Sequence, residues 1–214
     1  MATLFQSFSH NADVKLPSSL EEATVRLIDT IPDIEQMVFT AKINCSNPDD
    51  GLTSDESASI MLYTMEPSSK ENSFSYFLDR TMRTNDKQQL QPWLPYLKLL
   101  FHALSKLETK HRTIYRGVMG DVSANYPVGR KTGSSEFTIC ATSVKTLEEE
   151  QNFPNTGTRT LFAIEGESSR DISRHSYRET KDEILLMPDQ QFEVVSCLHP
   201  DNDLHIIQMK EIIS

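Results

Sequence analysis

The sequence is short of glycine, cysteine and basic residues, and each shortage excludes a class of protein. Only seven glycines occur among 214 residues, and none stands at the G-x-G-x-x-G or G-x-x-x-x-G-K spacing of phosphate-binding loops. The three cysteines are scattered, so neither a disulfide framework nor a metal site is predicted. Basic residues number 21 against 31 acidic ones, which argues against nucleic-acid binding because such proteins need a surplus of Lys and Arg.

Long hydrophobic runs are missing as well. No segment reaches the roughly 18 apolar residues of a membrane span, and residues 1–19 lack the basic and apolar regions of a signal peptide. The hydrophobic content of 37% and the charged content of 24% are ordinary for a globular chain. We therefore expect a cytoplasmic, monomeric protein that does not bind membranes, with secretion into a target cell as the alternative.

Helical signals dominate the first half of the chain, after an N-terminal arm expected over residues 1–16. Thr53 and Glu56 have the spacing of a capping box, in which each side chain satisfies the other's free amide. The apolar residues behind it recur at helical spacing, which predicts one buried helix face. We expect helices after Ser18 or Ser19, after Pro32, after Thr53, and over 73–83 and 91–107.

Strand signals follow Lys110. Short β-like runs alternate with Gly, Pro, Asn and Asp, and helices followed by strands are typical of an α+β protein. We expect one domain over residues 17–214, with a helical part at 17–110 and a β-core at 111–214. The predicted strands are 112–118, 136–144, 158–166, 182–188, 191–198 and 204–213.

Three of these strands carry a polar feature at one end: Arg116, the pair Thr142-Ser143, and Glu183. Each has an ordinary interpretation. An arginine in a strand is usually a solvated edge charge, and a glutamate before a strand keeps the edge soluble. Taken together and in this order, they are an arginine, a hydroxyl cluster and a carboxylate that a β-core could bring to one cleft.

This ordered set resembles the R-S-E class of mono-ADP-ribosyltransferases. Tyr115-Arg116-Gly117 is similar to the strand-borne Arg-Gly of that family, Cys140-Ala141-Thr142-Ser143 to its Ser-Thr-Ser strand, and Lys181-Asp182-Glu183 to its Glu-x-Glu. The motifs stand in the family's order over residues 112–214. The resemblance implies a split β-core of two packed sheets preceded by helices. It also implies NAD+ as co-substrate, no metal, and a protein or small-molecule acceptor of ADP-ribose.

The resemblance also assigns roles on the NAD+ side. Glu183 would stabilise the oxocarbenium-like ribose while the bond to nicotinamide breaks. Arg116 would neutralise the NAD+ phosphates, for which its planar fork is suited. Gly117 would bond the nicotinamide amide through its backbone, since it lacks a Cβ atom. Thr142 and Ser143 would orient Glu183 or contact the ribose. Tyr115 and Ala141 belong to the same binding set, and Phe153 is either a stacking surface for nicotinamide or ordinary loop packing.

Two departures from the family pattern concern activity and acceptor choice. Ala141 stands where the family has its first serine, so one bond that orients Glu183 is lost. Lys181 replaces the first Glu of Glu-x-Glu, and at about 4 Å two like charges repel by about 1 kcal/mol even in water. Lys181 thus argues against an arginine acceptor; Tyr177, Glu179 and Lys181 are the predicted acceptor-binding residues. The alternatives are NAD+ glycohydrolysis and a catalytically weakened NAD-binding module.

Overall fold

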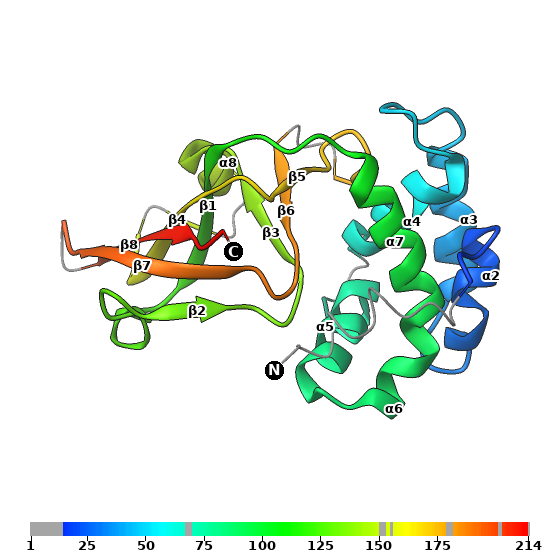
Figure 1. Cartoon of the computed structure of the whole chain (residues 1–214), viewed down its shortest axis with the longest axis horizontal. Coiled ribbons are helices and arrows are strands. Elements are labelled where there is room, and N and C mark those ends of the chain that lie inside the picture. Colours follow the sequence, from blue (N-terminus) through cyan, green and yellow to red (C-terminus); the bar gives the residue numbers. More distant parts are fainter. Residues whose placement is uncertain are drawn as a thin grey trace. The chain divides into compact units, whose positions relative to one another are not determined.

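The computed structural model divides the chain into two compact units. One consists of residues 1–108 and 172–181, and the other of residues 109–171 and 182–214. All the strands belong to the second unit, which confirms the predicted α+β class (Figure 1). The arm expected over residues 1–16 lies almost wholly outside the described residues, and the single domain over 17–214 stays a prediction. The structure describes residues 15–66, 70–149, 153–154, 156–178, 182–200 and 203–213.

The helical unit is built around α4 (Ser54–Thr64), which begins at the predicted capping box. The Thr53 amide donates to the Glu56 carboxylate at 2.7 Å, and the Glu56 amide donates to the Thr53 hydroxyl at 3.2 Å. The sequence predicted one buried face, whereas every residue from Glu56 to Thr64 is buried. The helix therefore lies at the centre of this unit, where no face meets solvent.

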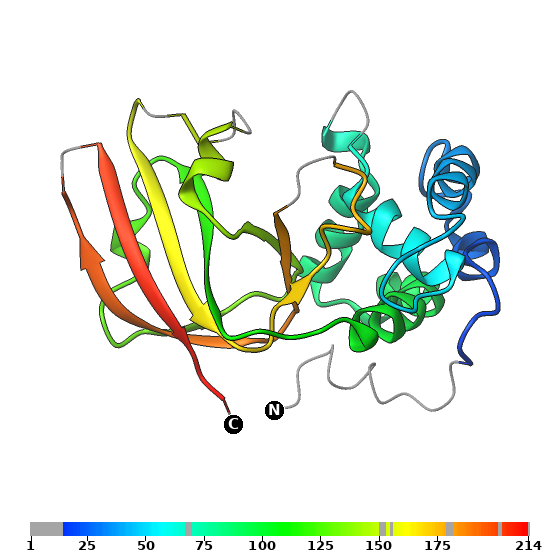
Figure 2. The same ribbon diagram turned by 90° about the horizontal axis from the view of Figure 1, so that it is seen from above.

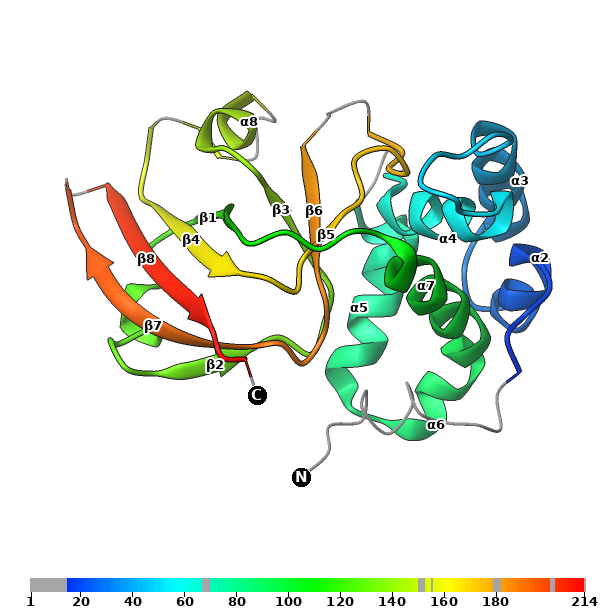
Figure 3. The same cartoon turned by 45° about the horizontal axis from the view of Figure 1, so that its top comes forward.

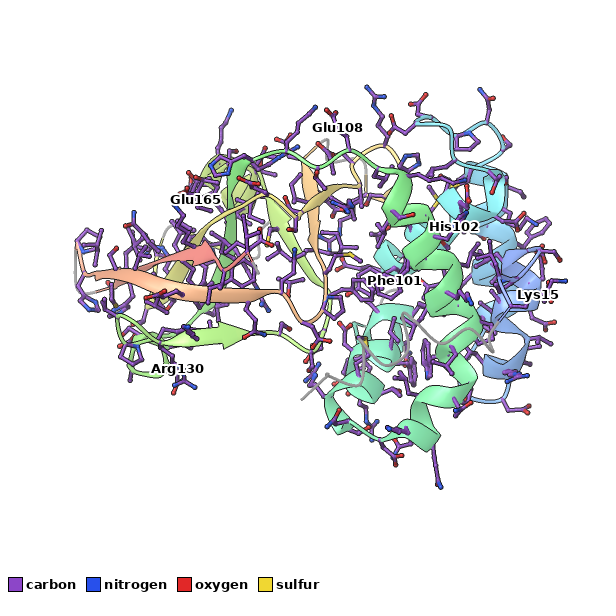
Figure 4. All side chains as sticks on the ribbon, viewed as in Figure 1. Lys15, Phe101, His102, Glu108, Arg130 and Glu165 are labelled. Carbon is purple, nitrogen blue, oxygen red and sulfur yellow. The ribbon has the colours of Figure 1, made fainter. Side chains whose placement is uncertain are left out.

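A second long helix, α7, packs against α4. Its residue Tyr96 is fully buried and donates its hydroxyl to the Ser59 carbonyl of α4 at 2.8 Å. Figure 4 shows Phe101 and His102 on this helix. Within the described ranges, none of the helices combines the length and apolar character needed to cross a membrane. The helices of this unit are α2 (Leu20–Thr24), η1 (Val25–Leu27), α3 (Ile34–Asn44), α4, η2 (Lys70–Asn72), α5 (Phe74–Thr84), α6 (Lys87–Leu90), η3 (Gln91–Trp93) and α7 (Leu94–Lys106).

The second unit contains one eight-stranded sheet in the order β2-β7-β8-β4-β1-β3-β6-β5. Figure 2 shows β8 in red beside β4 in yellow, and this pair is parallel while the other neighbours are antiparallel. The strands are β1 (Arg112–Met119), β2 (Lys131–Gly133), β3 (Thr138–Ala141), β4 (Arg159–Gly166), β5 (Arg170–Asp171), β6 (Glu183–Leu186), β7 (Gln191–Leu198) and β8 (Leu204–Glu211); η4 (Ser123–Asn125) and α8 (Val144–Glu149) complete the unit.

The sheet divides where β1 meets β3. These two strands share a single register pair, Tyr115 with Ala141, whereas β1 and β4 pair along their whole length. The strands β2, β7, β8, β4 and β1 thus form one group, and β3, β6 and β5 form the other. The two sheets expected from the resemblance are joined at this pair, and beyond it β1 and β3 fork apart.

Two apolar clusters cover the two faces of this unit. On one face the cluster is built from alternate residues of the strands, including Ile114, Cys140, Phe162 and Ile184. On the other face Ala141, Leu161, Leu147 of α8 and Phe153 pack together with Tyr115. Alternation along each strand therefore assigns every candidate side chain to one face or the other.

Candidate active site

The three predicted motifs lie at the same level on three neighbouring strands. Tyr115 of β1 stands opposite Ala141 of β3, and Ala141 stands opposite Glu183 of β6. Figure 3 shows these strands side by side. Directly opposed residues point to the same face of a sheet, so the three side chains share one face.

The Glu183 side chain is buried. Its residue is only 1% exposed, and β6 lies between β3 and β5 rather than at an edge. The interpretation of Glu183 as a solvated strand start is therefore wrong. A carboxylate in the interior of a sheet costs free energy unless its surroundings stabilise it, which makes a function at this position the better explanation.

Arg116 leaves the sheet on the other face. It follows Tyr115 in β1 and lies beside the face that carries Ile114, Cys140 and Phe162. β1 is a central strand, so Arg116 is not an edge charge, but its side chain is exposed as that interpretation expected. Arg116 directly follows Tyr115, whose pairing with Ala141 is the single register pair between β1 and β3.

A small cavity lies beside Arg116. Its volume is about 80 Å³, enough for one or two small polar groups but far too little for a dinucleotide. Arg116, Thr132, Ser134 and Thr138 line it, and the rest of the lining is mostly apolar, including Phe162, Phe192 and Met209. The cavity is therefore a largely apolar space with one cation and three hydroxyl-bearing residues in its wall.

Gly117 is covered by the ring of Phe153. A Cβ atom built on Gly117 would lie 2.3 Å from Cδ2 and 2.6 Å from Cγ of that ring. Phe153 is 2% exposed, and the Arg159 guanidinium lies 5.8 Å from the ring centroid. Gly117 thus provides room for Phe153, and the ring is used here for packing. Its stacking on nicotinamide stays a prediction.

The predicted hydroxyl cluster ends β3 and begins α8. The strand expected over 136–144 stops at Ala141, and Ser143 explains this end. Its hydroxyl accepts from the Thr146 amide at 3.1 Å and lies 2.9 Å from the Thr146 hydroxyl, so Ser143 caps the short helix. Ala141 is buried opposite Glu183 but has no hydroxyl to offer it. Thr142, half-buried between them, is the remaining predicted hydroxyl.

The Thr146 hydroxyl also donates to the Asp182 carboxylate at 3.1 Å. In the sequence Asp182 had only a place in the Lys181-Asp182-Glu183 motif and nothing pointed to Thr146, because the two residues lie 36 positions apart in the chain. This hydrogen bond holds the side chain of Asp182, the residue directly before Glu183 in the chain.

The segment before β6 belongs to the helical unit as far as it is described. Tyr177, a predicted acceptor-binding residue, is 44% exposed, and its amide donates to the Thr64 hydroxyl of α4 at 2.8 Å. Arg178 pairs with Glu66. Glu179 and Lys181 lie outside the described residues.

His175 holds the same segment through both ring nitrogens. Nδ1 lies 2.9 Å from the Ser57 hydroxyl, and Nε2 lies 3.2 Å from the Asp50 carboxylate. The order serine, histidine, aspartate is that of a nucleophilic triad. However, Ser57 is 2% exposed and His175 is 0% exposed, so no substrate reaches the hydroxyl. The arrangement is an anchor for the segment.

Two further observations concern metal-binding side chains and the Cys140 thiol. Among the residues that the structure describes, no group of three or more His, Cys, Asp or Glu side chains is arranged to hold a metal ion. Burial raises the pKa of the Cys140 thiol to about 12, against a smaller opposite effect of Arg116. Cys140 is therefore a thiol without nucleophilic character at neutral pH.

Comparisons with known proteins agree with this geometry. HopU1, an ADP-ribosyltransferase of Pseudomonas syringae pv. tomato DC3000, shares the fold with a TM-score of 0.64 and 18% identity, over 92% of this chain and 89% of HopU1. The eukaryotic mono-ADP-ribosyltransferase ART2.2 matches with a TM-score of 0.62 and 17% identity, over 91% and 84%.

A third similar structure is the ADP-ribosyltransferase Vis in complex with agmatine, with a TM-score of 0.59 and 17% identity, over 84% of this chain and 86% of Vis. A search of curated protein sequences finds no match. At these identities the structural likenesses establish the fold alone. The family model described as NAD:arginine ADP-ribosyltransferase matches residues 6–213. The chain therefore belongs to the NAD:arginine ADP-ribosyltransferase family and is an NAD+-dependent mono-ADP-ribosyltransferase.

Proposed function

We propose that Glu183 is the carboxylate that drives cleavage of NAD+, and that the acceptor of ADP-ribose is a group other than arginine. The register of Tyr115, Ala141 and Glu183 across three strands is the observation that carries the first part. It supports a site because it brings a buried carboxylate level with the β1 motif at the point where the sheet forks. Neither feature is needed for stability alone.

The main contribution of the protein to this reaction is electrostatic stabilisation of the charge that develops. The bond between the ribose C1′ and the nicotinamide nitrogen breaks, and its electron pair leaves with neutral nicotinamide. Positive charge develops on the ribose, where a fixed carboxylate stabilises it. A lone pair of the acceptor then bonds to C1′, and the acceptor loses a proton. Glu183 serves the first step by its charge.

Arg116 is proposed to bind the pyrophosphate of NAD+, and Gly117 its nicotinamide amide. The cavity beside Arg116 supports a phosphate contact through Thr132, Ser134 and Thr138, which line it with Arg116, while apolar side chains make up most of the remaining wall. Gly117 shares the face of Glu183, because it lies two residues after Tyr115 in β1. The fork between β1 and β3 supports this division, since an extended ligand could contact Arg116 and Glu183 there from opposite faces.

The proposal that the acceptor is not arginine depends on Lys181. In the family pattern a carboxylate at this position would attract a guanidinium, whereas a lysine repels it. The difference between attraction and repulsion at about 4 Å is about 2 kcal/mol in water, or roughly 30-fold in affinity. Tyr177 and Glu179 are the further residues of this segment that we propose to contact the acceptor.

One observation favours a second function, NAD+ glycohydrolysis. Ala141 stands directly opposite Glu183 and carries no hydroxyl, so Glu183 has fewer groups to orient it. With looser positioning, water could take the ribosyl group in place of a protein. If Glu183 were positioned too loosely for cleavage, the protein would bind NAD+ without cleaving it.

Nicotinamide release from NAD+ tests these proposals, measured with and without agmatine as an arginine analogue. We expect the wild type to release nicotinamide and to label protein from biotinylated NAD+. Glu183→Gln should lower release by about 100-fold or more, because it removes the charge and keeps the shape. Glu193→Gln, a change at an exposed residue of β7, is the control and should leave release unchanged.

The acceptor is tested by Lys181→Glu. This variant should gain agmatine-dependent turnover that the wild type lacks. Release without labelling would identify a glycohydrolase. A wild type that releases nothing at millimolar NAD+ would refute the catalytic proposal and leave a binding module.

A further inference from the structure

Asp182 is the middle residue of the Lys181-Asp182-Glu183 motif, between the two residues to which the proposed function assigns roles. Its carboxylate makes a hydrogen bond. It accepts a hydrogen bond from the Thr146 hydroxyl at 3.1 Å. The Thr146 hydroxyl lies 2.9 Å from the Ser143 hydroxyl, and Ser143 accepts from the Thr146 amide at 3.1 Å. The three side chains form a continuous chain of hydrogen bonds.

This chain joins two elements that must stay aligned. Ser143 and Thr146 belong to the start of α8, immediately after β3, while Asp182 immediately precedes β6. The backbones of β3 and β6 are already paired, and Ala141 with Glu183 is the last pair of that ladder. Beyond this pair the strand ladder ends, so the side-chain contacts of Asp182 continue the connection by one residue.

This chain of hydrogen bonds lies close to Ala141, which stands where the family pattern has a serine. Ala141 lies opposite Glu183 and has no hydroxyl with which to hold it. The connection from Asp182 to Thr146 begins one residue from Glu183, on the same pair of elements. A hydrogen bond to a carboxylate is among the stronger ones in proteins, and these side chains are only partly exposed, which limits competition from water.

We infer that Asp182 is a positioning residue for the NAD+-cleaving reaction, and that Thr146 and Ser143 hold it so that Glu183 keeps its orientation at the end of β6. The inference rests on the proposed role of Glu183. It gives the middle residue of the motif a function in the reaction, and it makes α8 part of the support of the site.

The experiment measures kcat and KM for NAD+ in nicotinamide release. Thr146→Val keeps the shape of the side chain and removes the hydroxyl, whereas Thr146→Ser keeps the hydroxyl and is the matched control. We expect Thr146→Val and Asp182→Ala each to lower kcat about tenfold with KM for NAD+ within about twofold of wild type. Thr146→Ser should stay within about twofold of wild type in both constants.

The double variant Thr146→Val with Asp182→Ala separates positioning from general damage. Because both changes break one contact, its kcat should fall no further than that of the single variants. If the losses multiply, or if Thr146→Val has the kcat of wild type, the inference is wrong. Should Thr146→Val fail to fold by circular dichroism, the comparison of Asp182→Ala with Asp182→Asn decides in its place, since Asn retains an acceptor oxygen and should recover most of kcat. A wild type that releases no nicotinamide overturns the function of Glu183 and this inference with it, whereas an active wild type with unaffected variants overturns this inference alone.

Discussion

Replacing Gly117 by alanine should destabilise the protein through one neighbour, the ring of Phe153. The new Cβ atom would lie 2.3 Å, 2.6 Å and 2.9 Å from three atoms of that side chain, where carbon atoms in contact normally stay about 3.5–4.0 Å apart. Phe153 is 2% exposed and packed in a cluster, so it has little room to withdraw. Overpacking of this kind costs about 1–3 kcal/mol.

A double-mutant cycle isolates this contact. Phe153→Ala alone should cost about 3–5 kcal/mol, because it empties a buried site. In that background the added methyl group of Gly117→Ala meets no ring, but the Cβ atom at position 153 remains 2.9 Å away, so the cost of the second change should fall without reaching zero. We expect a coupling free energy of about 1 kcal/mol, above the error of additivity for independent sites.

Urea unfolding followed by circular dichroism measures all four proteins. An equal cost of Gly117→Ala in both backgrounds would falsify the reasoning, since Phe153 would not be what excludes a side chain at Gly117. Nicotinamide release by the double variant adds a second result. If the double variant folds but releases less nicotinamide than Phe153→Ala alone, the missing Cβ atom of Gly117 also serves NAD+.

Three further predictions concern other parts of the chain. Cys140 should resist alkylation at pH 8 in the folded protein while the partly exposed Cys197 reacts, as peptide mass spectrometry would show, because burial raises the pKa of Cys140 to about 12. Burial acts to raise the pKa of Glu56, but hydrogen bonds from Lys106 and the Thr53 backbone outweigh it and lower the pKa below the ordinary 4.5. The stabilisation is therefore complete above that value and is lost as the pH falls through the folded pKa, so Lys106→Met should weaken the dependence of the melting temperature on pH below about 4.5. His175→Ala should speed tryptic cleavage at the neighbouring arginines severalfold, since it removes two anchors of that segment; unchanged cleavage would show that the anchors are dispensable.

Much of the local structure was predictable because its causes are local. The capping box of Thr53 and Glu56 needs only four consecutive residues, and it was found as predicted. The helices α5 and α7 follow from helical periodicity, and the strands β1, β4, β6, β7 and β8 from short β-like runs between turn residues. The end of β3 was misjudged, because Ser143 caps α8 and stops a run that otherwise reads as a continuous strand. The strands β2 and β5 were missed, since two or three residues carry no period.

For the candidate site, too, the sequence predicted local motifs but not their arrangement in space. The order of the motifs and the residues Arg116, Gly117 and Glu183 could be named from the sequence, because each motif is a run of three or four residues. Their relation in space could not. The sequence predicted that they converge in one cleft, whereas register and alternation place Arg116 and Glu183 on opposite faces beside a fork.

The sequence by itself determined the class of the fold and the family, since these depend on short patterns and their order, and it predicted Glu183 as the reacting carboxylate. Only the tertiary structure decided that Glu183 is buried and level with Ala141, and that Phe153 fills the space over Gly117. It alone joined His175 to Ser57, which lie 118 residues apart in the chain. The physical reason is that burial, register and contacts between distant residues arise from packing the whole chain, and no local pattern records them.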